Sequence, residues 1–323
     1  MAHVVFYSTH FSGKKTHFDS VHFYSKSDFA TSHFEEDVDF LSTKFFEETD
    51  FSSTQFLGHA LFNNSYFRNN TKFDSALFEK TTDFTETEFE NEVNFDKALF
   101  NLIAKFNKSK INEANILNIY FKFPVDFSDS EIEKIDLTGT VFNAYAVFNN
   151  CDIKNADRNT FRIIKHELIR NNNRLDTVIY HKKEMEAFRK ELNENKNNKY
   201  STLKKYQELF VLFINRWSNN YGTSWLRGFG FTFIIAFIFF FLLVQCGLNE
   251  RYFAWGWDNW SSFWDVCDMH LSYFFKFISP THGFEFDGIK LSGIGYFIDF
   301  ISRIAIGFGY FQIIQAFRKY KIW

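Results

Sequence analysis

A phenylalanine recurs every five or six residues over the first third of this chain, and this spacing most constrains its fold. The series begins at Phe18 and Phe23 and continues without interruption to Phe106. A helix turns about 100° per residue, so it would place successive phenylalanines on opposite sides. A strand alternates its faces with period two, so steps of five and six residues would not share a face. A solenoid that turns a corner every five or six residues buries all of them.

The neighbouring positions support this interpretation. The residue two places before each phenylalanine is small or β-branched, as at Thr82, Thr87 and Val93, and such side chains fit beside a large one in a narrow core. After Phe106 the spacing continues with mixed apolar residues as far as Ile153. The predicted repeat core includes Phe51, Phe56, Phe62, Phe67, Phe73, Phe78, Phe84, Phe89, Phe95 and Phe100.

The units TDFTE, TEFEN, ALFEK and SDFAT resemble the pentapeptide repeat family, with phenylalanine where many members have leucine. The resemblance implies a right-handed quadrilateral β-helix over residues 1–158, with four faces in each coil. Four faces need roughly 21 to 22 residues, so we expect roughly seven coils stacked at the inter-strand spacing. The recurrent sixth residue departs from the family pattern, and we place it at alternate corners.

Helical periodicity replaces the repeat from Asn159 onward. The stretches FRIIKHELIR and RLDTVIYHKKEMEAFRKEL predict two helices, and STLKKYQELFVLFINRW predicts a third, with Ser201 as its N-cap. Residues 159–220 are therefore expected to form a cytoplasmic helical linker. Its excess of lysine and arginine fits either a solvated surface or one that faces anionic lipid.

Two apolar stretches predict membrane spans, at about 228–248 and 291–317, within a membrane domain over residues 221–323. Lysine and arginine are concentrated before the first span and after the second, which places both termini in the cytoplasm. The N-terminus lacks the pattern of a signal peptide, and three scattered cysteines indicate a reducing compartment. We therefore expect a protein of the inner (cytoplasmic) membrane, in contact with membrane lipid.

The segment between the spans contains DMHLSYFFKFIS, whose length suits a re-entrant half-helix. Residues 215–319 resemble the two-span potassium-channel-like module that follows pentapeptide repeats in some bacterial proteins. That family's filter has a T-x-G-x-G pattern, whereas SPTHGFEF retains only Thr281 and Gly283, with His282 between them. The resemblance implies an ion-channel-like membrane region, and it leaves open a pore of other selectivity and a non-conducting anchor.

Charged residues add further candidates for pore or intramembrane sites. Asp299 and Arg303 lie four residues apart inside the second span, where they either serve the function or neutralise each other and join neighbouring subunits. Glycines in the same span permit the close helix approach that suits a homo-oligomer. The acidic residues Asp265, Asp268, Glu285 and Asp287 flank the expected entrance and would favour cations.

The two halves of the chain differ in net charge, and this difference bears on the functions that the chain could have. Residues 1–158 carry 25 acids and 15 bases, whereas residues 159–323 carry 14 acids and 21 bases. The histidines lack the spacing of a metal site or a catalytic nucleophile, so no enzyme, cofactor or metal is expected.

The leading hypothesis is an oligomeric channel-like effector or sensor. The alternatives are a membrane-anchored scaffold whose acidic solenoid binds a cytoplasmic protein, and a DNA mimic that binds a topoisomerase. Tethering at a membrane disfavours the DNA mimic, and no nucleic acid partner is expected.

Overall fold

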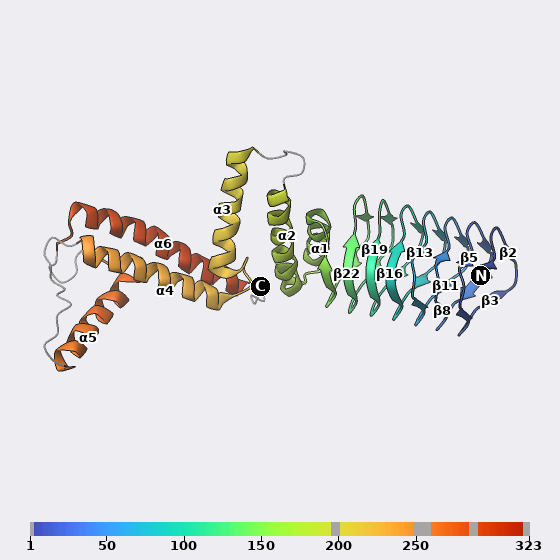
Figure 1. The fold of residues 1–323 in the computed structure, drawn as a ribbon, viewed down its shortest axis with the longest axis horizontal. Helices are drawn as coiled ribbons and strands as arrows, with labels where there is room; N and C mark the ends of the chain where they lie inside the picture. The colour runs from blue at the N-terminus through green and yellow to red at the C-terminus, as the bar shows by residue number, and fades with distance from the viewer. Residues whose placement is uncertain (1–2, 195–200, 248–259, 284–289, 319–323) are drawn as a thin grey trace. The chain divides into compact units, whose positions relative to one another are not determined.

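The computed structural model of the chain describes residues 3–194, 201–247, 260–283 and 290–318 (Figure 1). It divides into two compact units, Met1–Glu194 and Asn195–Trp323. The first unit holds a β-solenoid of about seven turns, and the second holds two long apolar helices that could span a membrane. The predicted fold class, a four-faced β-solenoid followed by helices, is confirmed.

The solenoid is built from short strands that pair in parallel with the coils before and after them, about 22 residues apart in the sequence. One row contains β1 (Val4–Val5), β5 (Ser27–Asp28), β9 (Thr49–Asp50) and β13 (Thr71–Lys72). The next contains β2 (His10–Phe11), β6 (His33–Phe34), β10 (Gln55–Phe56), β14 (Leu77–Phe78), β17 (Leu99–Phe100), β20 (Tyr120–Phe121) and β23 (Val141–Phe142).

The two remaining rows complete the coil. One contains β3 (Lys15–His17), β7 (Asp37–Asp39), β11 (Ala60–Leu61), β15 (Thr82–Asp83), β18 (Ala104–Lys105), β21 (Val125–Asp126) and β24 (Ala146–Val147). The other contains β4 (His22–Phe23), β8 (Lys44–Phe45), β12 (Tyr66–Phe67) and β25 (Asp152–Asn155). Strands β16 (Glu88–Asn94), β19 (Lys110–Asn115) and β22 (Glu131–Asp136) run through a corner, and each pairs in two of the four rows.

The phenylalanines fill the interior of the solenoid in stacked columns. The ten predicted core phenylalanines between Phe51 and Phe100 are all at most 2% exposed. Within one column, the rings of Phe62 and Phe84 stack with centroids 4.8 Å apart. Between columns, Phe62 and Phe73 meet edge to face at 5.6 Å. Offset stacks and edge-to-face contacts are the favoured aromatic geometries, so each ring adds to the stability beyond its buried area.

Alternate corners of the coil are tight turns with one residue in the left-handed region. At the corner after Phe40, Ser42 has φ 54° and the Thr43 amide donates to the Phe40 carbonyl at 3.2 Å. The buried Thr43 hydroxyl also donates to the carbonyl of Phe18 in the preceding coil, at 2.5 Å. The same backbone geometry recurs at Thr31, Ser53, Asn64, Ser75, Glu86, Lys97 and Lys108. The sixth residue falls in the other corners, as the spacing predicts.

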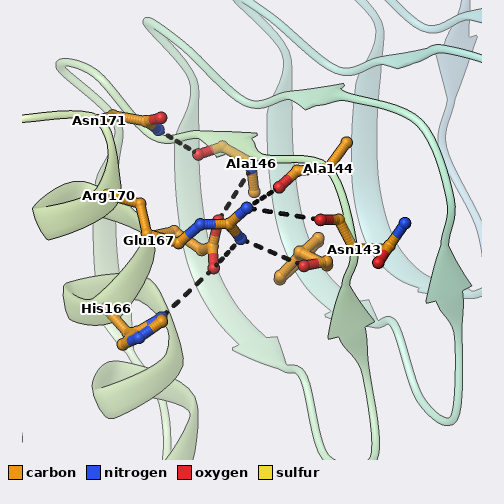
Figure 2. Close-up of polar contacts among 8 residues, drawn as sticks. Asn143, Ala144, Ala146, His166, Glu167, Arg170 and Asn171 are labelled. Carbon is orange, nitrogen blue, oxygen red and sulfur yellow. Dashed lines mark hydrogen bonds and ion pairs between the residues drawn. The ribbon is translucent and has the colours of Figure 1, made fainter.

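Helices α1 (Arg158–Arg170) and α2 (Arg174–Glu194) cover the C-terminal end of the solenoid. Figure 2 shows how α1 binds the last coil: Glu167 Oε2 accepts from the Ala146 amide at 3.2 Å, and Asn171 Nδ2 donates to the Ala146 carbonyl at 2.7 Å. Arg170 donates to Glu167 at 2.9 Å and to the carbonyls of Asn143 and Ala144. These side chains satisfy edge groups that would otherwise be left unpaired.

The second unit contains five helical segments within its described residues. These are α3 (Thr202–Asn219), α4 (Trp225–Leu242), a π-helical turn η1 (Leu243–Gly247), α5 (Trp260–Phe277) and α6 (Gly293–Phe317). Helix α3 begins as predicted, because Ser201 Oγ accepts from the Lys204 amide. The linker expected over residues 159–220 is divided, with α1 and α2 in the first unit and α3 in the second.

Candidate functional site

The two charges inside α6 form an ion pair within the helix. Arg303 Nε donates to Asp299 Oδ2 at 2.9 Å, one helical turn away. The Asp299 side chain is fully buried, and that of Arg303 is 21% exposed. A buried charge is costly unless it is paired, so each of these residues makes the other tolerable inside an apolar helix pair.

His282 joins this pair from the loop that follows α5. Its Nε2 lies 2.7 Å from Asp299 Oδ1, and its Nδ1 lies 2.5 Å from the carbonyl of Ser279. Both partners of the ring are hydrogen-bond acceptors. Arg303 Nη2 donates in turn to the His282 carbonyl at 2.7 Å. We call His282, Asp299 and Arg303 the buried triad.

The end of α5 and the loop that follows it pack against both α4 and α6. Phe274 near the end of α5 packs on Phe240 in the second half of α4, with ring centroids 5.6 Å apart. Tyr310 Oη donates to the Ile278 carbonyl at 3.4 Å. Tyr310 follows Gly293 by 17 residues, which is about 25 Å along a helix. The chain therefore lies beside the second half of α6 at Ile278 and beside the first half of α6 at His282.

Glycines allow α4 and α6 to approach closely. A methyl group on Gly309 would overlap Thr232, and one on Gly295 would overlap the backbone of Gly247. By contrast, a Cβ added at Gly293 or Gly307 would meet no atom within 4 Å in the described part of the chain. Of the four glycines of α6, which the sequence suggested could suit oligomerisation, Gly295 and Gly309 therefore pack inside the subunit, and Gly293 and Gly307 have open space beside them.

The other predicted site residues are distributed around the triad. Thr281 and Gly283, on either side of His282, are exposed. Asp265 and Asp268 are exposed on the first half of α5, whereas His282 of the triad follows the end of that helix. Glu285 and Asp287 lie outside the described residues. The sequence did not indicate the contacts of Ser279 and Tyr310, which are ordinary polar residues until the fold brings them together.

A second cluster of titratable groups lies on the first coils of the solenoid. His17, Asp19 and Asp39 place one ligand atom each within 4.8 Å of one another. The Lys15 ammonium, however, lies 2.6 Å from Asp39 Oδ2. That hydrogen bond raises the pKa of Lys15 above its usual value. A metal ion bound through Asp39 Oδ2 would have to displace this ammonium.

The contacts of the buried triad join the loop after α5 to α6. Its donors and acceptors are directed at one another, and they fix a non-helical loop against a membrane-length helix. Comparison of the chain with models of protein families, with characterised proteins and with solved structures gives no match.

Proposed function

We propose that this chain is the subunit of an oligomeric, channel-like membrane protein whose cytoplasmic β-solenoid, of the pentapeptide-repeat type, acts as a sensor. One observation carries the proposal. Helix α5 has 18 residues and is longer than the half-helix expected from the sequence; its end and the following loop lie beside α6, where the buried triad holds them. A simple membrane anchor needs neither a third helix of this kind nor a buried charge cluster.

The exposure of the loop supports an assembly of several copies. Irregular backbone is tolerated at membrane depth only where it is covered by protein or lines a water-filled cavity. Thr281 and Gly283 are exposed in the single chain, beside His282, whose side chain is 6% exposed. Neighbouring subunits would cover this loop or enclose water around it. Gly293 and Gly307 offer open sites for close contact between subunits.

The remaining features of the proposal come from charge and resemblance. A tetramer follows from the likeness to two-span channels. Acidic residues near the entrance, among them Asp265 and Asp268, would favour cations through their local field. The basic residues before α4 and after α6 support a topology with both termini in the cytoplasm of a bacterial cell and with α4 and α6 in the inner membrane. The acidic solenoid would then meet a cytoplasmic protein or ligand that biases opening.

A second candidate is a non-conducting, membrane-anchored scaffold that binds a cytoplasmic protein. One observation favours it. A potassium filter uses a run of consecutive backbone carbonyls to replace the ion's hydration shell. Here the middle carbonyl of the retained Thr281–Gly283 stretch, that of His282, accepts a hydrogen bond from Arg303. This carbonyl is engaged with the subunit's own side chain, so a filter of the potassium type would lack it.

Current through planar bilayers distinguishes the two candidates. Purified full-length protein is reconstituted in a salt gradient, and the reversal potential reports its ion preference. The channel proposal expects cation-preferring current, and it expects the double variant Glu285→Lys with Asp287→Lys to shift the reversal potential toward that of anions. A matched variant, Glu79→Lys on the solenoid, should leave the potential unchanged. Oligomers that carry no current with or without the triad would favour the scaffold.

A further inference from the structure

Helix α3 carries an exposed apolar stripe. Its members recur at alternating steps of three and four residues and so share one face of the helix. They are Leu203, Tyr206, Phe210, Phe213 and Trp217, and each is at least half exposed. A soluble monomer rarely exposes so large a contiguous apolar surface, so this face calls for a partner.

The stripe faces the same side from which α4 extends. The ring of Trp217, at the end of the stripe, meets Phe231 of α4 edge to face at 5.4 Å. Phe231 lies six residues inside α4, or about 9 Å along its axis. Figure 1 shows α3 running across the direction of α4 and α6. Where α4 and α6 cross a membrane, α3 therefore lies along its surface with the stripe turned inward.

The turn between α3 and α4 is fixed to the end of α6. Asn219 Nδ2 donates to the Gln312 carbonyl at 3.3 Å and to Gln315 Oε1 at 3.1 Å. The Asn219 side chain also accepts from the Gly222 amide at 2.8 Å. These contacts hold the end of α3 at the level where α4 begins and α6 ends.

Basic side chains lie on α3, at the start of α4 and at the end of α6. Lys204 lies in the first turn of α3, Arg216 in its last turn and Arg227 in the first turn of α4, and all three are exposed. Arg318 follows α6 at the same end and is exposed too. Lysine and arginine side chains near an anionic membrane surface are attracted to the lipid headgroups.

We propose that α3 is an interfacial helix that lies in the headgroup layer of an anionic phospholipid bilayer. Its stripe enters the boundary of the acyl chains, and the basic residues around it contact lipid phosphates. The proposal goes beyond the proposed function, because it requires only that α4 and α6 cross a membrane. It does not depend on whether the protein conducts.

The composition of the stripe favours lipid over a second copy of α3. Steps of three and four residues would also suit a coiled coil, whose seam takes branched aliphatic residues. Four of the five stripe residues are aromatic, and tyrosine and tryptophan are enriched where a membrane meets water. The contact of Trp217 with α4 also turns the stripe toward the volume that α4 itself occupies.

Spin labels on two faces of α3 test the proposal in full-length protein reconstituted into vesicles of phosphatidylcholine and phosphatidylglycerol in equal parts. A label is attached at Phe210→Cys on the stripe, or at Lys204→Cys as the matched control on the polar side. Cys246 and Cys267 are replaced by alanine. Cys151 is kept, because burial raises the pKa of its thiol to about 12 and leaves it unreactive.

The label at position 210 should collide often with oxygen and rarely with a water-soluble nickel chelate, and the label at position 204 should show the reverse. Vesicles of phosphatidylcholine alone should reduce this contrast. A label at position 210 that is shielded from both reagents would mean a protein contact and would overturn the proposal. Free access of the chelate to position 210 would overturn it too. Either failure leaves the bilayer current unaffected, so it is distinguishable from failure of the proposed function.

Discussion

Asp299 Oδ1 lies 2.7 Å from Nε2 of His282, seventeen residues earlier in the chain, and this contact fastens the loop after α5 to α6. Asp299 accepts from Arg303 through its other oxygen, so both carboxylate oxygens are used inside the subunit. The arrangement links α4, α5 and α6 into one assembly, because α5 also packs on α4.

Breaking one side of the triad should cost more than removing both charges. Asp299→Asn leaves the partly buried Arg303 guanidinium without its carboxylate partner, which should lower the unfolding free energy by about 3 kcal/mol. Adding Arg303→Gln should restore part of this loss, with a coupling energy of about 1 to 3 kcal/mol. Thermal unfolding in detergent compares the four proteins of the cycle. Strictly additive effects would show that the pair does not act as a unit.

The solenoid core should depend on each ring of its columns. Phe84 is fully buried, and Phe84→Ala should destabilise the surrounding coils by about 3 to 5 kcal/mol. The neighbouring Thr85 is half-buried and its hydroxyl donates to Asp83 Oδ1, so Thr85→Ala should cost only about 1 kcal/mol. Amide hydrogen exchange in β11 and β18 of the full chain measures both. Equal effects would contradict the inward placement of Phe84.

The junction of α1 and α2 should weaken in acid. Burial alone would raise the pKa of Glu184, but hydrogen bonds from Lys165 at 2.5 Å and Arg162 at 3.3 Å outweigh it and lower that pKa below the usual 4.5. This contribution to stability is therefore fully present above pH 4.5 and is lost as the pH falls toward the lower folded-state pKa. Hydrogen exchange across α1 should show this loss in the wild type, and Glu184→Gln should abolish it. An unchanged acid response in the variant would exclude Glu184 as its source.

The orientation in the membrane can be read from cysteine labelling in intact cells. Lys80 on the solenoid and Lys290 before α6 are both exposed. With Cys246 and Cys267 replaced by alanine, an impermeant reagent should label Lys290→Cys from outside and should reach Lys80→Cys only after lysis. Labelling of position 80 alone in intact cells would reverse the proposed topology.

The sequence predicted the solenoid because its signal is local and repeated. Each phenylalanine at a step of five or six residues reports the same inward position, and no other regular backbone accommodates that step. The capping role of Glu167 and Arg170 was not predicted, because both look like ordinary charges on an amphipathic helix. Their partners are backbone groups of Ala144 and Ala146, which any sequence would present.

The same distinction applies to the buried triad. Asp299 and Arg303 are one helical turn apart, so their pairing follows from helix geometry alone. The approach of His282 depends on the chain folding back after α5, and the packing of Phe274 on Phe240 helps to fix that path. Nothing in the local pattern around His282 selects Asp299 as its partner.

The number of subunits around the exposed loop tests the central claim most directly. Native mass spectrometry of full-length protein released from lipid nanodiscs counts the copies, since an enclosed central pore requires several of them. We expect a closed homo-oligomer, a tetramer by likeness to two-span channels, and an added bulky side chain in Gly307→Leu should weaken it while Thr85→Ala does not. A protein that is monomeric in lipid, with the triad intact, would contradict the claim of an enclosed pore.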